Sequence, residues 1–229
     1  MTASGRHIAL AQAYDGITRV VADLDDADLQ RPTGCRGWLV ADLLFHVLCD
    51  AQRALVALAS PAPGPADVDQ VSYWRSFPPG GAAGGDRHAW WARRSASAFE
   101  RPSGVVRLWS DTAPAAVRAA GAAVHGDDPE RCVTTQGHVI RIPDLLATLT
   151  TEAVLHHLDL IVDLPDAPRP GAAAVAVTLT TLDGLRADAP RPAGWDDQDY
   201  LLKASGRRPL TDADRRELGA AAERFPLLG

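Results

Sequence analysis

Lysine is almost absent from the 229 residues of this chain, because Lys203 is its only lysine. The other basic residues are arginines scattered along the sequence, and the net charge at pH 7 is −6. A protein that binds nucleic acid usually presents a concentrated basic patch. The sequence therefore predicts no nucleic-acid partner.

Long apolar runs and paired cysteines are also missing. No segment offers the roughly 20 consecutive apolar residues of a membrane span, and the N-terminal segment lacks the apolar core and cleavage site of a signal peptide. Cys35, Cys49 and Cys132 are odd in number and widely spaced, which argues against a disulfide framework. We expect a cytoplasmic protein with reduced thiols and no membrane partner, either a monomer or a homodimer.

Several catalytic signatures are absent as well. The sequence contains no G-x-S-x-G nucleophile turn, no phosphate-binding loop and no dinucleotide fingerprint. These absences direct attention to side chains that can bind a metal ion or a small molecule.

What the sequence does contain is helical periodicity. Apolar residues recur at helical spacing over four long segments, at roughly 4–24, 38–60, 86–124 and 143–164, the third interrupted or kinked at Pro102. Residues 131–142 alternate around Gln136-Gly137, which predicts a short β-hairpin. The fold class predicted is all-α, a four-helix bundle with a short β-hairpin and a helical C-terminal extension.

The division of the chain follows from this pattern. We expect residues 1–168 to form the bundle and residues 169–229 to form the extension, packed on the bundle. The extension should contain helices at 171–187, 199–206 and 210–225, the last beginning at Thr211 as N-cap.

Two residues in the fourth predicted bundle helix suggest a metal site. Glu152 and His156 are four residues apart, so both lie on one helix face about 6 Å apart. His46 lies among apolar residues in the second helix, and ligands on facing helices converge in bundle cores. Two imidazoles and one carboxylate form the ligand set of an open catalytic Zn²⁺ site, although Ni²⁺, Fe²⁺ or Mn²⁺ would also accept these donors.

Other interpretations of these residues remain open. His46 alone would be read as a hydrogen-bonded core histidine, and Glu–His pairs at this spacing are common on solvated helix faces. Asp42, Asp50 and Asp159 could each accept a hydrogen bond from a ligand histidine and fix its tautomer. Cys35 and Cys132 lie in a predicted loop and a predicted hairpin, and a nucleophilic cysteine is not predicted.

Two stretches resemble a known family. PTGCRGWLVADLLFHVL (32–48) is similar to the C-x-G-W-x-V-x-D-L-x-x-H signature of mycothiol-dependent maleylpyruvate isomerase-like proteins, and TTEAVLHHLDL (150–160) is similar to their E-x-x-x-H-H-x-D signature. These proteins belong to the DinB-like superfamily of metal-binding four-helix bundles. The resemblance covers most of residues 7–225.

The resemblance implies roles for several residues. It implies that His46, Glu152 and His156 are the metal ligands and that mycothiol, a low-molecular-weight thiol, is the co-substrate. The thiol would add to a small electrophilic substrate, giving isomerisation or thiol transfer. Asp159 and Arg207 are further candidates for catalytic residues, with Arg207 binding an anionic substrate or thiol. Trp38 and His157 are candidates for cofactor-binding residues, with His157 as a neighbour or pocket wall.

The sequence also departs from this family. Its isomerase members carry a separate α+β C-terminal domain, whereas the tail here is short and helical. Two alternatives therefore stay open. One is a metal-dependent hydrolase that uses bound water, with Asp50 or Asp159 as general base. The other is a non-catalytic metal- or ligand-binding module, in which Cys49 could be a fourth protein ligand.

Overall fold

The computed structural model describes residues 1–77 and 82–228. Its helices and strands are, in chain order, α1 (Ala3–Val21), α2 (Val40–Leu58), β1 (Pro61–Ala62), α3 (Ala82–Ala96), α4 (Ser103–Val124), β2 (Cys132–Thr135), β3 (His138–Arg141), α5 (Ile142–Leu160), α6 (Ala172–Arg186), α7 (Asp197–Ala204) and α8 (Asp212–Leu218). Short 3₁₀ helices lie at Asp28–Gln30 (η1), Ser72–Ser76 (η2) and Gly219–Arg224 (η3).

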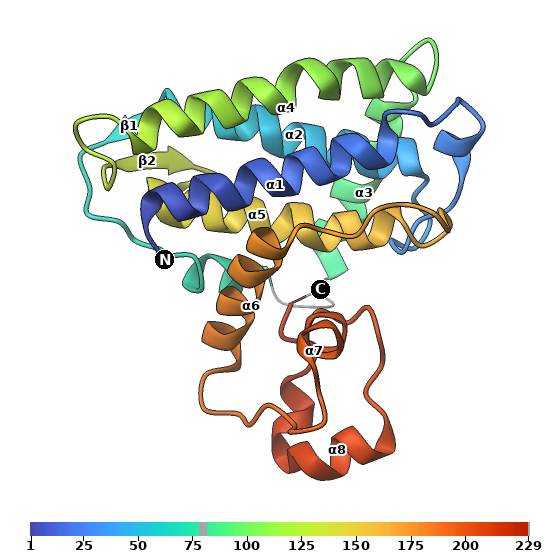
Figure 1. Ribbon diagram of the computed structural model, residues 1–229, viewed down its shortest axis with the longest axis vertical. Coiled ribbons are helices and arrows are strands. Elements are labelled where there is room, and N and C mark those ends of the chain that lie inside the picture. Colours follow the sequence, from blue (N-terminus) through green and yellow to red (C-terminus); the bar gives the residue numbers. More distant parts are fainter. Residues whose placement is uncertain (78–81, 229) are drawn as a thin grey trace.

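Four long helices, α1, α2, α4 and α5, lie side by side as a bundle (Figure 1). Both α1 and α2 pack against α4 and α5, so α1 and α2 are diagonally opposite. The predicted all-α bundle is confirmed. In the described part of the chain, no helix combines the length and the apolar character needed to cross a membrane.

The helix predicted over 86–124 is divided in the structure. It consists of α3, which packs against α2, and α4, which belongs to the bundle. Residues 97–102 separate them, and Pro102 directly precedes α4. Proline cannot donate the backbone hydrogen bond that a continuous helix would need at this position, so the chain turns there.

Helix α5 is the most enclosed of the four bundle helices, because α1, α2 and α6 all pack against it. Every residue of α5 is buried except Glu152 and His156, which are partly buried. Among the residues of α5, Glu152 and His156 are therefore the most accessible to solvent.

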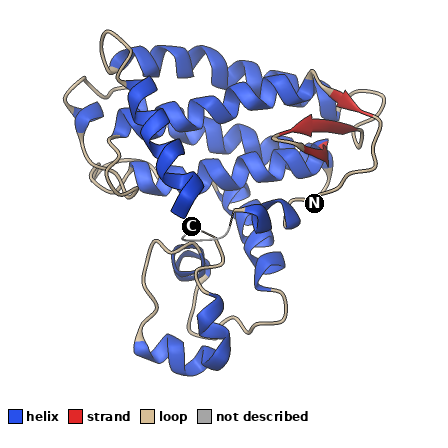
Figure 2. Cartoon of the chain, turned by 180° about the vertical axis from the view of Figure 1, so that it is seen from behind, coloured by secondary structure: helices blue, strands red, loops and turns tan. Residues whose placement is uncertain are grey.

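The predicted hairpin is confirmed, as β2 and β3 pair antiparallel with Thr135 opposite His138. Gln136 and Gly137 both have positive φ angles, 48° and 82°, as a two-residue type I′ turn requires. A third strand, β1, pairs with β2 at one end of the bundle (Figure 2). The sequence did not predict β1, because two residues are too few to show a period-2 pattern.

The C-terminal segment places α6 against α1 and α5, and α7 against α6 (Figure 1). Thr211 caps α8 as predicted, accepting a hydrogen bond from the Asp214 backbone N–H. The predicted continuous helix 210–225 is wrong in its length. Helix α8 ends at Leu218, because Gly219 has a φ of +55° that an α-helix does not allow, and η3 follows.

Asp214 joins the helices at the end of the chain. Its carboxylate accepts a hydrogen bond from Trp195 Nε1 at 2.6 Å and pairs with Lys203 Nζ at 2.9 Å. Burial alone would raise the pKa of Asp214, but the hydrogen bonds from Lys203, Thr211 and Trp195 outweigh it and lower the pKa. A carboxyl with a lowered pKa stabilises the fold above its unfolded-state pKa, and this contribution is lost as the pH falls.

We therefore expect Asp214→Asn to destabilise the protein. Removing one partner of a buried ion pair leaves Lys203 without its counter-charge, at a cost of about 3 kcal/mol. Urea denaturation at neutral pH measures the change, which should shrink under acid conditions where wild-type Asp214 becomes protonated. Asp188→Asn is the control, because this side chain is 93% exposed and pairs with Arg224 at the surface. Equal stability of the two variants would contradict the prediction.

Candidate metal centre

The three predicted metal ligands come together where α2 packs against α5. His46 lies in the middle of α2, and Glu152 and His156 occupy successive turns of α5. Glu152 Oε1 lies 3.0 Å from His46 Nε2 and 3.2 Å from His156 Nε2. The two imidazole rings meet edge to face with centroids 4.8 Å apart. Both imidazole rings thus contact the same carboxylate oxygen, Glu152 Oε1.

Glu152 and His156 shift each other's pKa values in opposite directions. Burial would raise the pKa of Glu152, but the nearby histidines, His156 above all, hold it well below its ordinary value. Burial would lower the pKa of His156, but Glu152 and the hydrogen bond with Asp159 raise it well above its ordinary value. A carboxylate and a charged imidazole stabilise each other here.

The donor set fits a divalent cation. The three donor atoms all lie within 4.8 Å of one another. Ligand atoms around a tetrahedral Zn²⁺ with bonds of about 2.1 Å lie about 3.4 Å apart, close to the two histidine–glutamate distances. Among the described residues, a second group of possible donors consists of Cys35, His156 and Asp159. Cys49, considered as a fourth ligand, belongs to neither group. Three protein donors would leave one coordination position for a small molecule.

Asp159 supports His156 from the other side of its ring. His156 Nδ1 lies 3.1 Å from Asp159 Oδ2, so Nδ1–H donates to the carboxylate and Nε2 points toward Glu152. Arg207 Nη2 donates to the same Oδ2 at 2.7 Å. Burial would raise the pKa of Asp159, but His156 and Arg207 together lower it to about 2.

Of the two predicted cofactor-binding residues, Trp38 adjoins the cluster and His157 does not. Trp38 packs against His46, with ring centroids 5.5 Å apart and nearly perpendicular planes, so it adjoins the cluster. His157 faces α1 instead, where it is fully buried close to Gly16, and its Nε2–H donates to the Pro168 carbonyl at 2.8 Å. The structure does not bring His157 to the cluster.

The aspartates near His46 have structural partners of their own. Asp42 accepts a hydrogen bond from the Leu39 backbone N–H at 3.0 Å, at the start of α2. Asp50 pairs with Arg53 at 3.0 Å. Of the three aspartates considered as partners of a ligand histidine, Asp159 is the one that the structure places on a ligand ring.

Sequence reasoning missed Cys35. Its thiol donates to Asp159 Oδ2 at 3.3 Å and lies 3.8 Å from His156 Nδ1. Cys35 was not predicted to belong to the site, because its partners are more than 120 residues away along the chain. Its place in the PTGCRGW stretch, a few residues before His46, was the available signal.

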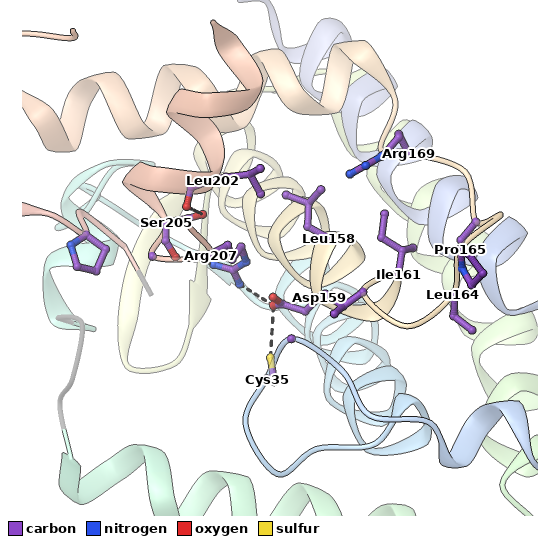
Figure 3. Close-up of a pocket in the computed structure, with 15 residues that line it drawn as sticks. Cys35, Leu158, Asp159, Ile161, Leu164, Pro165, Arg169, Leu202, Ser205 and Arg207 are labelled. Atoms are coloured by element: carbon purple, nitrogen blue, oxygen red, sulfur yellow. Dashed lines mark hydrogen bonds and ion pairs between the residues drawn. The ribbon is translucent and has the colours of Figure 1, made fainter. Parts of the chain in front are cut away.

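A cavity of about 730 Å³ adjoins this cluster on the Asp159 side. Its wall includes Cys35, Asp159, Arg169, Ser205 and Arg207, together with apolar side chains at the end of α5 (Figure 3). The bundle and the C-terminal segment both contribute to the wall. The cavity thus offers two guanidinium groups and an apolar surface beside the carboxylate that holds His156.

Comparison with known proteins identifies the family of this chain. Residues 10–161, well over half of the chain, match the family described as the mycothiol maleylpyruvate isomerase N-terminal domain. The chain belongs to this family. The matched residues include His46, Glu152 and His156, whereas Arg207 lies beyond them. Among curated proteins, no relative matches the sequence.

Solved structures give the fold of this family. A histidine-to-alanine mutant of mycothiol-dependent maleylpyruvate isomerase superposes with a TM-score of 0.53 at 18% identity, covering 80% of this chain and 68% of that chain. A second structure of that isomerase gives a TM-score of 0.51 at 17% identity, with the same coverage. At such identity the likeness shows a shared fold.

The geometry predicts that His46 is required for metal binding. We expect about one Zn²⁺ per chain in the wild type and none in His46→Ala, because two donors from α5 alone bind a cation weakly. Elemental analysis after dialysis against Zn²⁺ measures the ratio. His125→Ala serves as control, since His125 is exposed and its described contacts, with the Gly121 carbonyl and the His7 ring, are outside the cluster. Equal zinc in His46→Ala and the wild type would contradict the prediction.

Proposed function

We propose that the protein is a metal-dependent enzyme that uses a low-molecular-weight thiol, mycothiol, for thiol transfer to a small electrophilic substrate or for its isomerisation. The observation that carries this proposal is the convergence of two imidazole Nε2 atoms on one carboxylate oxygen. Membership of the mycothiol maleylpyruvate isomerase family supports the thiol. We propose Zn²⁺ as the metal, with Ni²⁺, Fe²⁺ and Mn²⁺ as alternatives.

A divalent cation at these donors would lower the pKa of a bound thiol, so that a nucleophile exists at neutral pH. The protein's part is to hold the donors in place. Asp159 accepts a hydrogen bond from His156 Nδ1–H, so Nε2 is the ring nitrogen that would bind the cation. Glu152 supplies one negative charge among the three donors.

The cavity beside the cluster suggests how a substrate would be oriented. Arg169 and Arg207 line it, and guanidinium groups recognise carboxylates and phosphates with fixed geometry. We propose that they orient an anionic group of the substrate or of the thiol. Residues 169–229 supply part of this wall, so we propose that the extension completes the active site that the bundle, residues 1–168, begins.

The hydrolase alternative is less well supported by the contacts. It requires a carboxylate that is free to take a proton from water. Asp159 Oδ2 already accepts hydrogen bonds from His156, Arg207 and Cys35, and Asp50 is paired with Arg53. Asp159 is thus engaged, whereas Asp50 keeps one oxygen, Oδ2, that has no hydrogen-bond partner among the described residues.

The test is consumption of mycothiol with a panel of small electrophiles that includes maleylpyruvate. We expect turnover in the Zn²⁺-loaded wild type, and a loss of at least 100-fold in His46→Ala or when the thiol is omitted, because the thiol is then neither bound nor ionised.

Two outcomes would contradict the proposal. Turnover of an ester or amide panel without thiol would favour the hydrolase. Stoichiometric metal with no thiol binding and no turnover would favour a non-catalytic metal-binding module. His125→Ala, with an unchanged cluster, should retain wild-type turnover.

A further inference from the structure

The loop between η1 and α2 contacts both ligand histidines. Within it, Trp38 packs on the ring of His46, and Cys35 reaches the carboxylate that holds His156. The Gly34 backbone N–H also donates to the Asp159 carbonyl at 2.9 Å. One short segment, residues 33–38, thus adjoins the outer side of the cluster on both helices.

This loop is internally bonded. The Trp38 carbonyl accepts from the Thr33 backbone N–H at 3.1 Å and from the Thr33 hydroxyl at 3.0 Å. The Thr33 hydroxyl oxygen in turn accepts from the Cys35 backbone N–H at 3.2 Å. These bonds fix the backbone of Cys35, so its thiol is held toward Asp159.

The loop also lies unusually close to α5. A Cβ atom placed on Gly34 would be 2.7 Å from Asp159 Oδ1 and 3.2 Å from the Asp159 Cα. The second atom belongs to the backbone of α5 and cannot move aside as a flexible side chain can. Only glycine allows this approach, and the approach brings the Cys35 thiol within hydrogen-bond distance of the carboxylate.

Asp159 is held from two sides. Arg207 and Cys35 reach the same oxygen, Oδ2, from opposite sides (Figure 3). Without the thiol, Arg207 Nη2 at 2.7 Å would be the closer of the two remaining partners of Oδ2, because His156 Nδ1 lies at 3.1 Å. The carboxylate would then turn toward Arg207 and away from His156 Nδ1.

We infer that Cys35 is a positioning residue for the metal site: its thiol, together with the close approach at Gly34, holds the Asp159 carboxylate in line with His156 Nδ1. The inference rests on the proposed function, since it concerns the same cation. Cys35 acts through Asp159 and is not a ligand of that cation, because it lies on the Nδ1 side of His156 whereas Glu152 and His46 lie on the Nε2 side.

The experiment compares Cys35→Ala, Cys35→Ser and, as the matched control, Cys132→Ala in β2. The first readout is Zn²⁺ affinity, measured by competition with a chelator. Loss of a group that orients a ligand histidine typically weakens metal binding 10–100-fold. We expect about tenfold weaker binding in Cys35→Ala, near wild-type binding in Cys35→Ser, whose hydroxyl can still donate, and no change in Cys132→Ala.

The second readout does not require metal. The His156 Nδ1–H proton should be protected from solvent exchange by Asp159 and visible by NMR in the wild type and in Cys35→Ser. In Cys35→Ala it should exchange at least several-fold faster. A purely structural role of Cys35 would change stability without changing this proton.

A second pair of variants tests the close approach without altering sulfur. Gly34→Ala should weaken Zn²⁺ binding at least tenfold with helical content retained, because its methyl group displaces Asp159. Gly194→Ala is the control, since nothing lies within 4 Å of the added carbon. Wild-type affinity in Gly34→Ala would overturn the inference.

Failure of the inference can be distinguished from failure of the proposed function. If Zn²⁺ binds and is lost in His46→Ala, while Cys35→Ala keeps wild-type affinity and wild-type proton exchange, the inference alone is wrong. If no variant binds Zn²⁺, the proposed function fails and the exchange measurement still decides the role of Cys35. A second bound Zn²⁺ that disappears in Cys35→Ala would make Cys35 a ligand and overturn the positioning role.

Discussion

The site depends on one buried carboxylate oxygen, Glu152 Oε1. Removing an ionised carboxylate from water costs several kcal/mol unless the charge is paired and hydrogen-bonded. Here the compensation comes from an imidazole on its own helix and an imidazole on α2. The packing of α2 on α5 is therefore tied to the chemistry of the cluster, because the Glu152 carboxylate pairs with one imidazole from each helix.

A second chain of contacts extends outward from this point. His156 donates to Asp159, and Asp159 receives Arg207 from the segment after α7 and Cys35 from the loop before α2. Three parts of the chain that are distant in sequence meet at one carboxylate. Their charges alternate, and this arrangement lets each group remain ionised or polar while mostly excluded from solvent.

The sequence predicted those features that repeat or that lie on one helix. Glu152 and His156 were recognisable because i,i+4 spacing fixes their shared face, and His46 because it interrupts an apolar helix. Arg207 was identified as a candidate catalytic residue that binds an anion, and its pairing with Asp159 was not foreseen. Cys35 was missed for the same physical reason. Both contacts join a loop to α5, and the position of a loop depends on tertiary packing, which the spacing of residues in the sequence does not reveal.

The errors in the fold have similar causes. The break between α3 and α4 was indicated by Pro102, but the sequence could not show that only α4 would join the bundle. The end of α8 at Leu218 depends on the left-handed conformation of Gly219, and glycine is also tolerated within helices at modest cost. Strand β1 forms by pairing with the edge of β2, which lies far from it in the sequence.

The cavity wall is formed by residues of the bundle and of the C-terminal segment. This has a consequence for how such a protein changes over evolutionary time. The cation's donors belong to helices α2 and α5, which are constrained by their mutual packing. Arg207 and Ser205 belong to the appended segment, which contributes to the cavity wall without supplying any of the three donors. Under the proposed function, substitutions at wall positions such as Ser205 would change which molecules the cavity admits while the three donors stay in place, whereas Arg207 also holds the Asp159 carboxylate and is more constrained.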